Sequence, residues 1–247
     1  MNSSWAAARL RGAWSLRAPL ALGAAALLSA IAFAEIADEI VEGPSGSLRW
    51  IDERVLGAFI RLRSPWLNDL AVEFTALGSA TLIMTVTLIA VTVLWLARLR
   101  GRAVQLLLAA SGAGITMLMT KWVFARPRPE PLHRVIAESG FSFPSGHSLE
   151  AAAVYFTLAL LACRHFRAAG ARFVLLMFAV LISVGVAASR VYLGVHYPSD
   201  VSAGLCLGVA WALIVQALAS WLGDRTDGQQ SDDSVQQRDA AGADPPA

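Results

Sequence analysis

Three short segments of this 247-residue chain combine cationic, histidine and carboxylate side chains at regular spacings. Lys121 is the only lysine, and Arg128-Pro129 follows it seven residues later. The second segment is Pro144-Ser145-Gly146-His147, and the third is Ser189-Arg190-x5-His196-x3-Asp200. Three cations, two histidines and one carboxylate are the groups needed to hold a phosphate and break its ester.

The two histidines suit opposite tasks. His196 and Asp200 lie four residues apart, so they can share one helix face. A carboxylate there can hold the far ring nitrogen, which sets the tautomer and makes the other nitrogen a nucleophile. His147 has different neighbours and suits a general acid, which must begin protonated.

The remaining groups can bind the phosphoryl oxygens. Lys121, Arg128 and Arg190 would neutralise their charge, and Ser145 and Gly146 would add a hydroxyl and backbone N–H groups at a helix N-terminus. Because the protein supplies three cations, this chemistry needs no metal and no cofactor. The chain also lacks a clustered Asp/Glu set that would bind a metal.

The elements that position these groups are predicted to cross a membrane. The chain is 56% hydrophobic and only 15% charged, whereas soluble domains carry about 25% charged residues. Four uncharged runs are long enough to span the hydrocarbon layer, and two weaker runs come close. We therefore expect an all-α, polytopic bundle of six transmembrane helices, at residues 18–34, 74–97, 103–120, 148–163, 173–189 and 201–223.

Arginine placement predicts the orientation. Clusters of arginine precede the first helix and fill the links at 98–102 and 164–172, so this face is expected to be cytoplasmic. The links 121–147 and 189–200 then lie outside. Under this alternation Lys121 ends the third helix and His147 opens the fourth, while Arg190 ends the fifth and His196 opens the sixth. All four helix ends fall on the extracytoplasmic face.

These segments resemble the three motifs of the type 2 phosphatidic acid phosphatase superfamily, without a substitution at the key positions. The resemblance covers roughly residues 66–222. It implies that His147 protonates the leaving group, that His196 forms a phosphohistidine and that Asp200 orients it. It also implies metal independence and a phosphate site made of Lys121, Arg128, Ser145, Gly146 and Arg190.

The resemblance further implies a membrane lipid phosphate or diphosphate as substrate. For a short, bacterial-looking chain we expect undecaprenyl diphosphate, converted to undecaprenyl phosphate at the periplasmic side of the inner membrane. Phosphatidate, phosphatidylglycerol phosphate and lipid A phosphates are alternatives. The vanadium haloperoxidases use a similar oxyanion site but are soluble. A transporter would place ionisable groups near the bilayer midplane, but the four uncharged runs have none. A non-catalytic membrane protein of this family would usually lack motif residues, and none is missing here. A net charge of +2 gives no sign of a nucleic-acid partner.

Domain boundaries follow from the same pattern. We expect a cytoplasmic N-terminus at 1–17, a membrane phosphatase domain at 18–222 with its motif-bearing core at 66–222, and a disordered, acidic cytoplasmic tail at 223–247. Ala32-Phe33-Ala34 also resembles a signal-peptide cleavage site, which would remove the first helix. Cys163 and Cys206 read as small core residues and not as a disulfide.

Several features leave alternatives open. Residues 48–62 predict an amphipathic helix on the outer surface, either a lip beside a lipid entrance or simple cover for the bundle. Its apolar stripe is expected to consist of Leu48, Ile51, Val55, Phe59 and Leu62. Arg126-Pro127 is a second Arg-Pro pair, but the family spacing selects Arg128. Arg126 would then flank the site or meet lipid headgroups. Glu150 either buffers a site arginine or His147, or faces water in the cavity.

Overall fold

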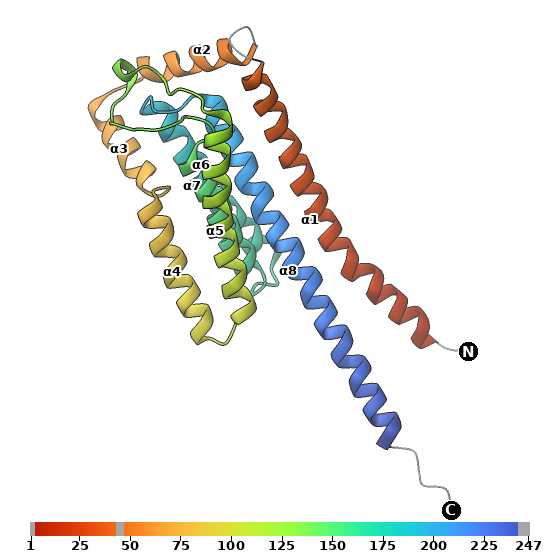
Figure 1. Ribbon diagram of the computed structural model, residues 1–247. Helices are drawn as coiled ribbons and strands as arrows, with labels where there is room; N and C mark the ends of the chain where they lie inside the picture. Colours follow the sequence, from red (N-terminus) through yellow and green to blue (C-terminus); the bar gives the residue numbers. More distant parts are fainter. Residues whose placement is uncertain (1–2, 43–46, 242–247) are drawn as a thin grey trace, which may run out of the picture.

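The computed structural model describes residues 3–42 and 47–241, and in these ranges the chain is helical with one long link, residues 125–145 (Figure 1). The helices are α1 (Ser3–Val41), α2 (Ser47–Arg61), α3 (Pro65–Ala76), α4 (Ala80–Leu96), α5 (Arg100–Phe124), the 3-10 turn η1 (Pro131–His133), α6 (Gly146–Cys163), α7 (Ala169–Tyr192) and α8 (Pro198–Ala241). The all-α prediction is confirmed.

Within these described ranges, five helices are long and apolar enough to cross a membrane, and the bent pair α3–α4 makes a sixth span. The spans agree with the predicted runs except for the second. Residues 74–97 were expected to form one helix, but the chain bends by 43° between α3 and α4. The predicted first helix, 18–34, is also longer, with an apolar span over Leu20–Val41.

The α3–α4 break has a local cause. Ser79 lies in an extended conformation and its side chain accepts a hydrogen bond from the backbone N–H of Leu82 at 3.3 Å, so it caps a new helix. Gly78 makes the break compact, because a Cβ there would lie 2.5 Å from Val186 and 3.1 Å from the carbonyl oxygen of His147. The break therefore packs directly against the start of α6.

Helices α6 and α8 approach each other closely where the second and third motifs meet. A Cβ on Gly204 of α8 would lie 2.6 Å from the carbonyl oxygen of Ser145. The backbone N–H of Ser145 donates to the carbonyl oxygen of Asp200 at 3.0 Å. Glycine at this contact lets the two motif-bearing helix starts lie side by side.

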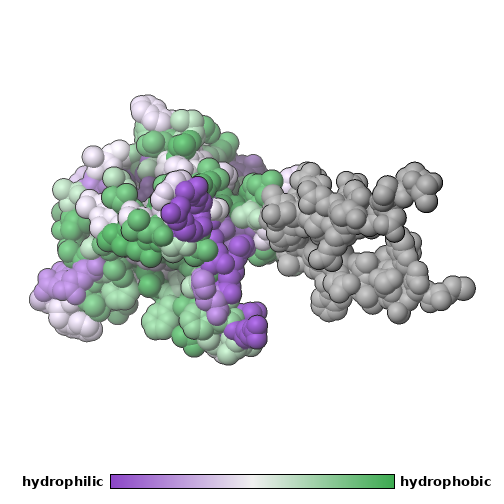
Figure 2. All heavy atoms as spheres, turned by 90° about the horizontal axis from the view of Figure 1, so that it is seen from below, coloured by the Kyte–Doolittle hydropathy of each residue, from purple (hydrophilic) through white to green (hydrophobic). Residues whose placement is uncertain are grey.

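The outer faces of the bundle are apolar. Large side chains such as Leu88 (67% exposed), Phe178 (61%) and Leu108 (54%) point away from the core, as expected for surfaces that meet lipid. Figure 2 looks onto the end of the bundle formed by the α4–α5 and α6–α7 links, and it shows hydrophilic patches among hydrophobic residues. We call this the α4–α5 end, and the opposite one the α2 end.

Helix α2 lies across the bundle, as expected for an amphipathic surface helix (Figure 1). The face it buries differs from the prediction, which assigned Ile51 to the apolar stripe. Ile51 is 43% exposed, whereas Asp52 is 1% exposed and Leu56 is 5% exposed. The inner face is therefore centred on a carboxylate, for which the partners are described below.

Both ends of the chain extend the membrane helices. The backbone of residues 223–241 continues α8 as a helix, in a segment for which the sequence predicted a disordered acidic tail. No proline precedes Pro245 in this segment, so the helical hydrogen bonding can continue. Residues 242–247 and residues 1–2 of the predicted N-terminal segment lie outside the described ranges.

The region that resembles a cleavage site shows no break in α1. Phe33 stacks on Phe143 with ring centroids 5.9 Å apart, and Ala37 shares a buried cluster with Phe143 and Ala203. This helix therefore packs on the loop that precedes α6. Cys163 and Cys206 are both free, as predicted.

Candidate active site

The structure brings the predicted site residues together at the α2 end. Their positions on the helices differ slightly from expectation. Lys121 lies one turn inside α5, which continues to Phe124, and Arg190 lies two residues before the end of α7. Helix α8 begins at Pro198, so His196 lies in the turn before it and Asp200 in its first turn.

The ring of His196 has two distinct sides. Its Nδ1 lies 3.4 Å from Asp200 Oδ2 and 3.4 Å from Ser142 Oγ. Its Nε2 lies 3.0 Å from Arg128 Nη1. A guanidinium group can only donate, so Nε2 is the acceptor and carries the lone pair, and the ring proton is on Nδ1. This is the tautomer that a nucleophilic Nε2 requires.

Burial also keeps the ring neutral. His196 is 1% exposed. Burial lowers the pKa of His196 to about 4, although the hydrogen bond and the charge of Asp200 act in the opposite direction. Arg128 and Arg190 lower it further. At neutral pH the ring is therefore uncharged, and the Nε2 lone pair is available to attack an electrophile.

Two predicted phosphate ligands, Arg128 and Arg190, share one carboxylate. Glu138 Oε2 lies 2.5 Å from Arg190 Nη2, and Glu138 Oε1 lies 3.7 Å from Arg128 Nη2. Burial alone would raise the pKa of Glu138, but the hydrogen bond and charge of Arg190, with Arg128, bring it below its usual range. An internal anion thus bridges the two arginines beside His196.

Arg190 keeps an unused donor. Its Nη1 donates to Thr75 Oγ1 at 3.0 Å, and the whole residue is 1% exposed. Its Nε is buried and has no hydrogen-bond partner among the described residues. A buried donor without an acceptor is costly, so it marks a place where an anionic ligand would be stabilised.

Lys121 and His147 border the same space. The Lys121 ammonium donates to the carbonyl oxygen of Phe141 at 2.5 Å. It interacts electrostatically with Arg128, Arg190 and Glu138. The half-buried His147 interacts with Arg190, Glu138 and His196 in the same way, and no side-chain bond to its ring occurs within the described ranges. Its ring is thus available to a leaving group.

Ser145 and Gly146 open α6. The Ser145 hydroxyl accepts a hydrogen bond from Ser148 Oγ at 3.0 Å, and its backbone N–H is taken by the carbonyl oxygen of Asp200. The anion-binding donors at this helix start are therefore the N–H groups that follow Ser145, beginning with Gly146. Met117 packs beside Gly146, since an added Cβ would lie 3.2 Å from Met117 Cγ.

A buried network holds the far side of His196. Asp200, which is 0% exposed, accepts at Oδ2 from Ser142 Oγ at 2.5 Å and from the backbone N–H of Tyr197 at 2.8 Å. Arg126 Nη1 donates to its Oδ1 at 2.5 Å. Both carboxylate oxygens are thus satisfied, and the carboxylate is held in one orientation toward His196.

The network continues to α2. Arg126 Nη2 donates to Asp52 Oδ2 at 2.8 Å, and Asp52 also accepts from the backbone N–H of Ser199 at 2.8 Å and from its hydroxyl at 2.5 Å. We call Asp52, Arg126, Ser142, Ser199 and Asp200 the carboxylate network. Arg126 therefore contacts carboxylates beside His196, and Asp52 brings α2 into the same network.

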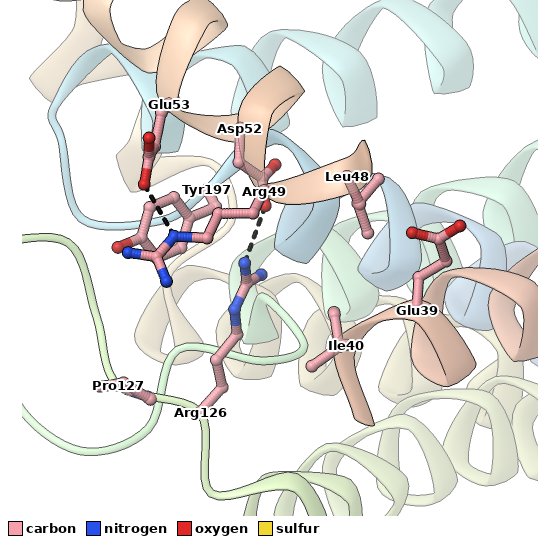
Figure 3. A pocket seen from close by; sticks show the side chains of 9 residues that line it. All are labelled: Glu39, Ile40, Leu48, Arg49, Asp52, Glu53, Arg126, Pro127 and Tyr197. Atoms are coloured by element: carbon pink, nitrogen blue, oxygen red, sulfur yellow. Dashed lines mark hydrogen bonds and ion pairs between the residues drawn. The ribbon is translucent and has the colours of Figure 1, made fainter. Parts of the chain in front are cut away.

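A cavity of about 270 Å³ lies beyond this network, bordered by the end of α1, α2, Arg126 and Tyr197 (Figure 3). The guanidinium of Arg126 stacks 4.4 Å from the ring centroid of Tyr197. On the rim, the exposed pair Arg49 and Glu53 forms an ion pair at 2.8 Å. The phosphate-binding candidates do not line this cavity, so it lies behind His196.

Sequence reasoning missed Glu138, Ser142 and Asp52. Only Asp52 carried a signal, because a lone aspartate spaced four residues from both Leu48 and Leu56 lies on the inner stripe of α2. Glu138 and Ser142 lie in a long loop without periodicity. Glu150 interacts electrostatically with Lys121, a partner that the sequence analysis did not consider.

The chain is similar in sequence to known proteins. Residues 102–224 match the PAP2 superfamily. A phosphatidylglycerophosphatase B of Bacillus subtilis is 32% identical over 67% of this chain and 81% of that protein. YbjG of Escherichia coli, whose name carries a provisional assignment as an undecaprenyl-diphosphatase, is 34% identical over 66% of this chain and 78% of that protein.

A solved structure agrees with the fold. The crystal structure of a transmembrane PAP2-type phosphatidylglycerolphosphate phosphatase from Bacillus subtilis superposes with a TM-score of 0.69 and 29% identity, over 81% of this chain and 94% of that one. Together with the six apolar spans and the identity to the B. subtilis relative over most of its length, this likeness leads to one conclusion. The chain belongs to the PAP2 superfamily, as a multi-pass membrane phosphatase.

Proposed function

We propose that this protein removes a terminal phosphate from a membrane lipid through a phosphohistidine on His196. One observation carries the proposal: Nε2 of His196 faces Arg128, while Nδ1 faces Asp200. This is the orientation that an in-line attack on a bound phosphate needs. The described residues contain no His, Cys, Asp or Glu cluster suited to a metal, and metal independence stays a prediction to be tested with chelator.

The first step forms a bond and breaks a bond. The Nε2 lone pair attacks phosphorus, and the bond from phosphorus to the lipid oxygen breaks. The electron pair of that bond moves to the lipid oxygen, which takes the proton of His147. Lys121, Arg128 and Arg190 neutralise the phosphoryl oxygens, and Asp200 stabilises the charge that develops on the His196 ring.

The second step releases the product. Water attacks phosphorus, and His147, now neutral, accepts a proton from that water. The bond between Nε2 and phosphorus breaks, which returns His196 to its neutral state and frees inorganic phosphate. Before either step, the substrate phosphate must displace the carboxylate of Glu138 from the arginines, because both would occupy the same cationic space.

Two lipids are the leading substrates. Undecaprenyl diphosphate is the prediction made from the sequence, and the likeness to YbjG supports it. Phosphatidylglycerol phosphate is supported by the likeness to the B. subtilis phosphatase in both sequence and structure. Phosphatidate and lipid A phosphates are further alternatives, since the groups around His196 bind the phosphate itself.

The test is phosphate release by purified protein in detergent with chelator present, using each lipid in turn. We expect turnover of at least one leading substrate, lost in His196→Ala and kept in His133→Ala. His133 is the matched control because it lies in the nearby η1 turn and contributes only backbone atoms to the hydrogen bonds described. Turnover that persists in His196→Ala would overturn the mechanism.

We also propose that the α2 end faces the periplasm of a bacterial inner membrane, with both termini in the cytoplasm. The arginine-rich links at the α4–α5 end support this orientation. The test uses Ser139→Cys and Arg167→Cys in a background without the native cysteines, with a membrane-impermeant maleimide on intact spheroplasts. We expect labelling of the first only, and the reverse pattern would contradict the orientation.

A further inference from the structure

A cavity of about 690 Å³ lies at the α4–α5 end, far from His196. It is enclosed by the link between α4 and α5, by the first turns of α5, by the far end of the apolar part of α8, and by Arg164 after α6. Figure 2 views this end and shows hydrophilic patches beside apolar surface. The proposed chemistry at the α2 end makes no use of this cavity.

Four guanidinium groups line the cavity, those of Arg98, Arg100, Arg102 and Arg164. In the part of the chain that the structure describes, none of them forms an ion pair with a carboxylate. Burial lowers the pKa of Arg164, and the charge of Arg102 lowers it further. Like charges are thus held near one another, and an occupant with negative charge would relieve their repulsion.

The first turn of α5 adds to this positive field. The helix begins at Arg100, and its earliest N–H groups lack partners within the helix. Leu99 supplies one acceptor, for the N–H groups of Arg102 and Ala103 at 3.0 and 3.1 Å. The positive end of the helix dipole therefore points toward the same space as the arginines.

The other wall of the cavity is apolar and lies deeper. Val104 and Leu108 of α5 face Val215 and Leu218 of α8, and all four belong to membrane-spanning segments. The cavity thus has cationic groups at the helix ends and apolar walls along the spans. This arrangement is complementary to a phospholipid, which has its phosphate at the interface and its acyl chains below.

Polar contacts on the inner side tie the two helices that form this apolar wall. Gln105 Nε2 donates to Gln216 Oε1 at 2.7 Å, and both amides are buried. Trp211 Nε1 donates to the carbonyl oxygen of Leu108 at 3.1 Å. These bonds link α5 and α8 beside the cavity, so its walls are held in place and an occupant need not push the helices apart.

We propose that this cavity binds one anionic phospholipid of the leaflet opposite the active site. The phosphate would lie among Arg98, Arg100, Arg102, Arg164 and the start of α5, and an acyl chain would lie along Val104, Leu108 and Val215. A zwitterionic lipid would bring no net negative charge to the four arginines. Free phosphate would leave the apolar wall uncovered. The occupant therefore needs both a net negative charge and a hydrocarbon chain.

The test is native mass spectrometry of the full-length protein from neutral detergent, with phosphatidylglycerol and phosphatidylcholine of the same acyl chains. We expect retention of one phosphatidylglycerol molecule, weakened about tenfold or more in Arg102→Gln/Arg164→Gln, because each basic residue at the surface contributes to anionic-lipid binding. Glycerol phosphate, which lacks acyl chains, should not displace the lipid.

A matched variant separates this site from general electrostatics. Arg167→Gln/Arg172→Gln removes the same charge at the same end, but neither residue lines the cavity. We expect it to retain the lipid. Equal loss in both double variants, or equal retention of phosphatidylcholine, would overturn the proposal. Loss in Arg128→Gln alone would instead move the lipid to the phosphate-binding arginines. The phosphatase activity of Arg102→Gln/Arg164→Gln should be unchanged, which checks that this double variant folds.

Discussion

Both ends of this bundle gather arginine, but the side chains are used differently. Around His196, Arg126, Arg128 and Arg190 donate to carboxylates, hydroxyl groups or carbonyl oxygens, and each has a bond to a distant part of the chain. At the α4–α5 end, Arg98, Arg100, Arg102 and Arg164 have no carboxylate partner among the described residues. Residue type alone does not distinguish the two groups.

The difference in pairing matches the different tasks that we propose for the two groups. Paired guanidinium groups are held in fixed directions, which is what a site must provide to stabilise charge in a transition state. At the α4–α5 end, the Arg102 side chain contacts the ring of His165 at 2.6 Å and Arg100 lies over Trp95, so neither positive charge is neutralised by a carboxylate of the described ranges. Arg126 and Arg128 illustrate the first case within one Arg-Pro-Arg-Pro segment, since one holds Asp200 and the other lies beside His196 Nε2.

The largest expected effect comes from Asp200→Asn. The amide cannot hold the Nδ1 proton as a carboxylate does and removes one partner of Arg126, so we expect kcat/KM to fall about 10³- to 10⁴-fold, as for comparable carboxylate–histidine pairs. Steady-state phosphate release measures it. Asp69→Asn, at an exposed aspartate of α3, is the control and should be near wild type. A loss below tenfold in Asp200→Asn would show that the pairing is not needed.

A smaller loss is expected from Arg190→Gln. This change removes a charged donor set, including the buried Nε without a partner, so we expect kcat to fall about 10²- to 10³-fold. Arg61→Gln, at the exposed end of α2, changes the same charge without touching the site. If both variants kept wild-type kcat, the paired arginines would have no catalytic task.

Acid should act through His196. Only the neutral ring attacks, so kcat/KM should fall about tenfold per pH unit once the pH drops below the folded pKa of His196, which is about 4. The unfolded ring binds its proton nearer pH 6.5, so folding stability should already decline from about pH 6.5 down to that value.

The loss of rate and the loss of folding stability can be separated by measuring the rate at each pH. The rate should recover fully on return to neutral pH. Thermal unfolding of His196→Gln should show a shallower decline of Tm between pH 6.5 and 4 than the wild type. An identical decline would mean that another group, and not His196, is responsible for the acid sensitivity.

A modest effect is expected from Asp52→Asn. The change keeps the shape of the side chain but weakens its hydrogen bonds to Arg126 and Ser199. We therefore expect kcat to fall about tenfold with little change in KM. Glu53→Gln is the matched control, because Glu53 is the next residue of α2, pairs only at the surface with Arg49 and lies away from the network. Equal activity of the two variants would reduce α2 to simple cover.

The smallest effect concerns Glu138→Gln. The neutral amide competes less with an anion for Arg128 and Arg190, so inorganic phosphate should inhibit about threefold more strongly, within the range of a single exposed charge pair. Inhibition constants with and without the change measure it. Glu130→Gln, in the same loop without an ion pair among the described residues, serves as control. Weaker inhibition in Glu138→Gln would contradict direct competition.

Much of this site could be predicted because its residues end or begin long apolar helices. Hydropathy locates the helix ends, and arginine placement sorts them by membrane side, so Lys121, His147, Arg190 and His196 were expected at one end. Helix bounds were less accurate, because His196 lies in a turn that no hydropathy pattern separates from α8.

The missed residues depend on long-range contacts. Asp52 is more than 140 residues from Ser199 along the chain and reaches it only because α2 crosses the bundle. The break at Gly78 depends on the close approach of α6. Neither feature leaves a signal in the local amino-acid composition. The α4–α5 cavity was likewise hidden, since its arginines were read only as a sign of membrane side.

The central claim is that His196 becomes covalently phosphorylated. The most direct measurement is trapping of the intermediate from lipid labelled in its terminal phosphate, quenched in alkaline detergent and mapped by mass spectrometry. We expect the phosphoryl group on the peptide that contains His196, with none in His196→Ala. The label should also persist longer in His147→Ala, if that variant still reacts. A phosphoryl group on any other residue, or turnover without labelled His196, would contradict the account.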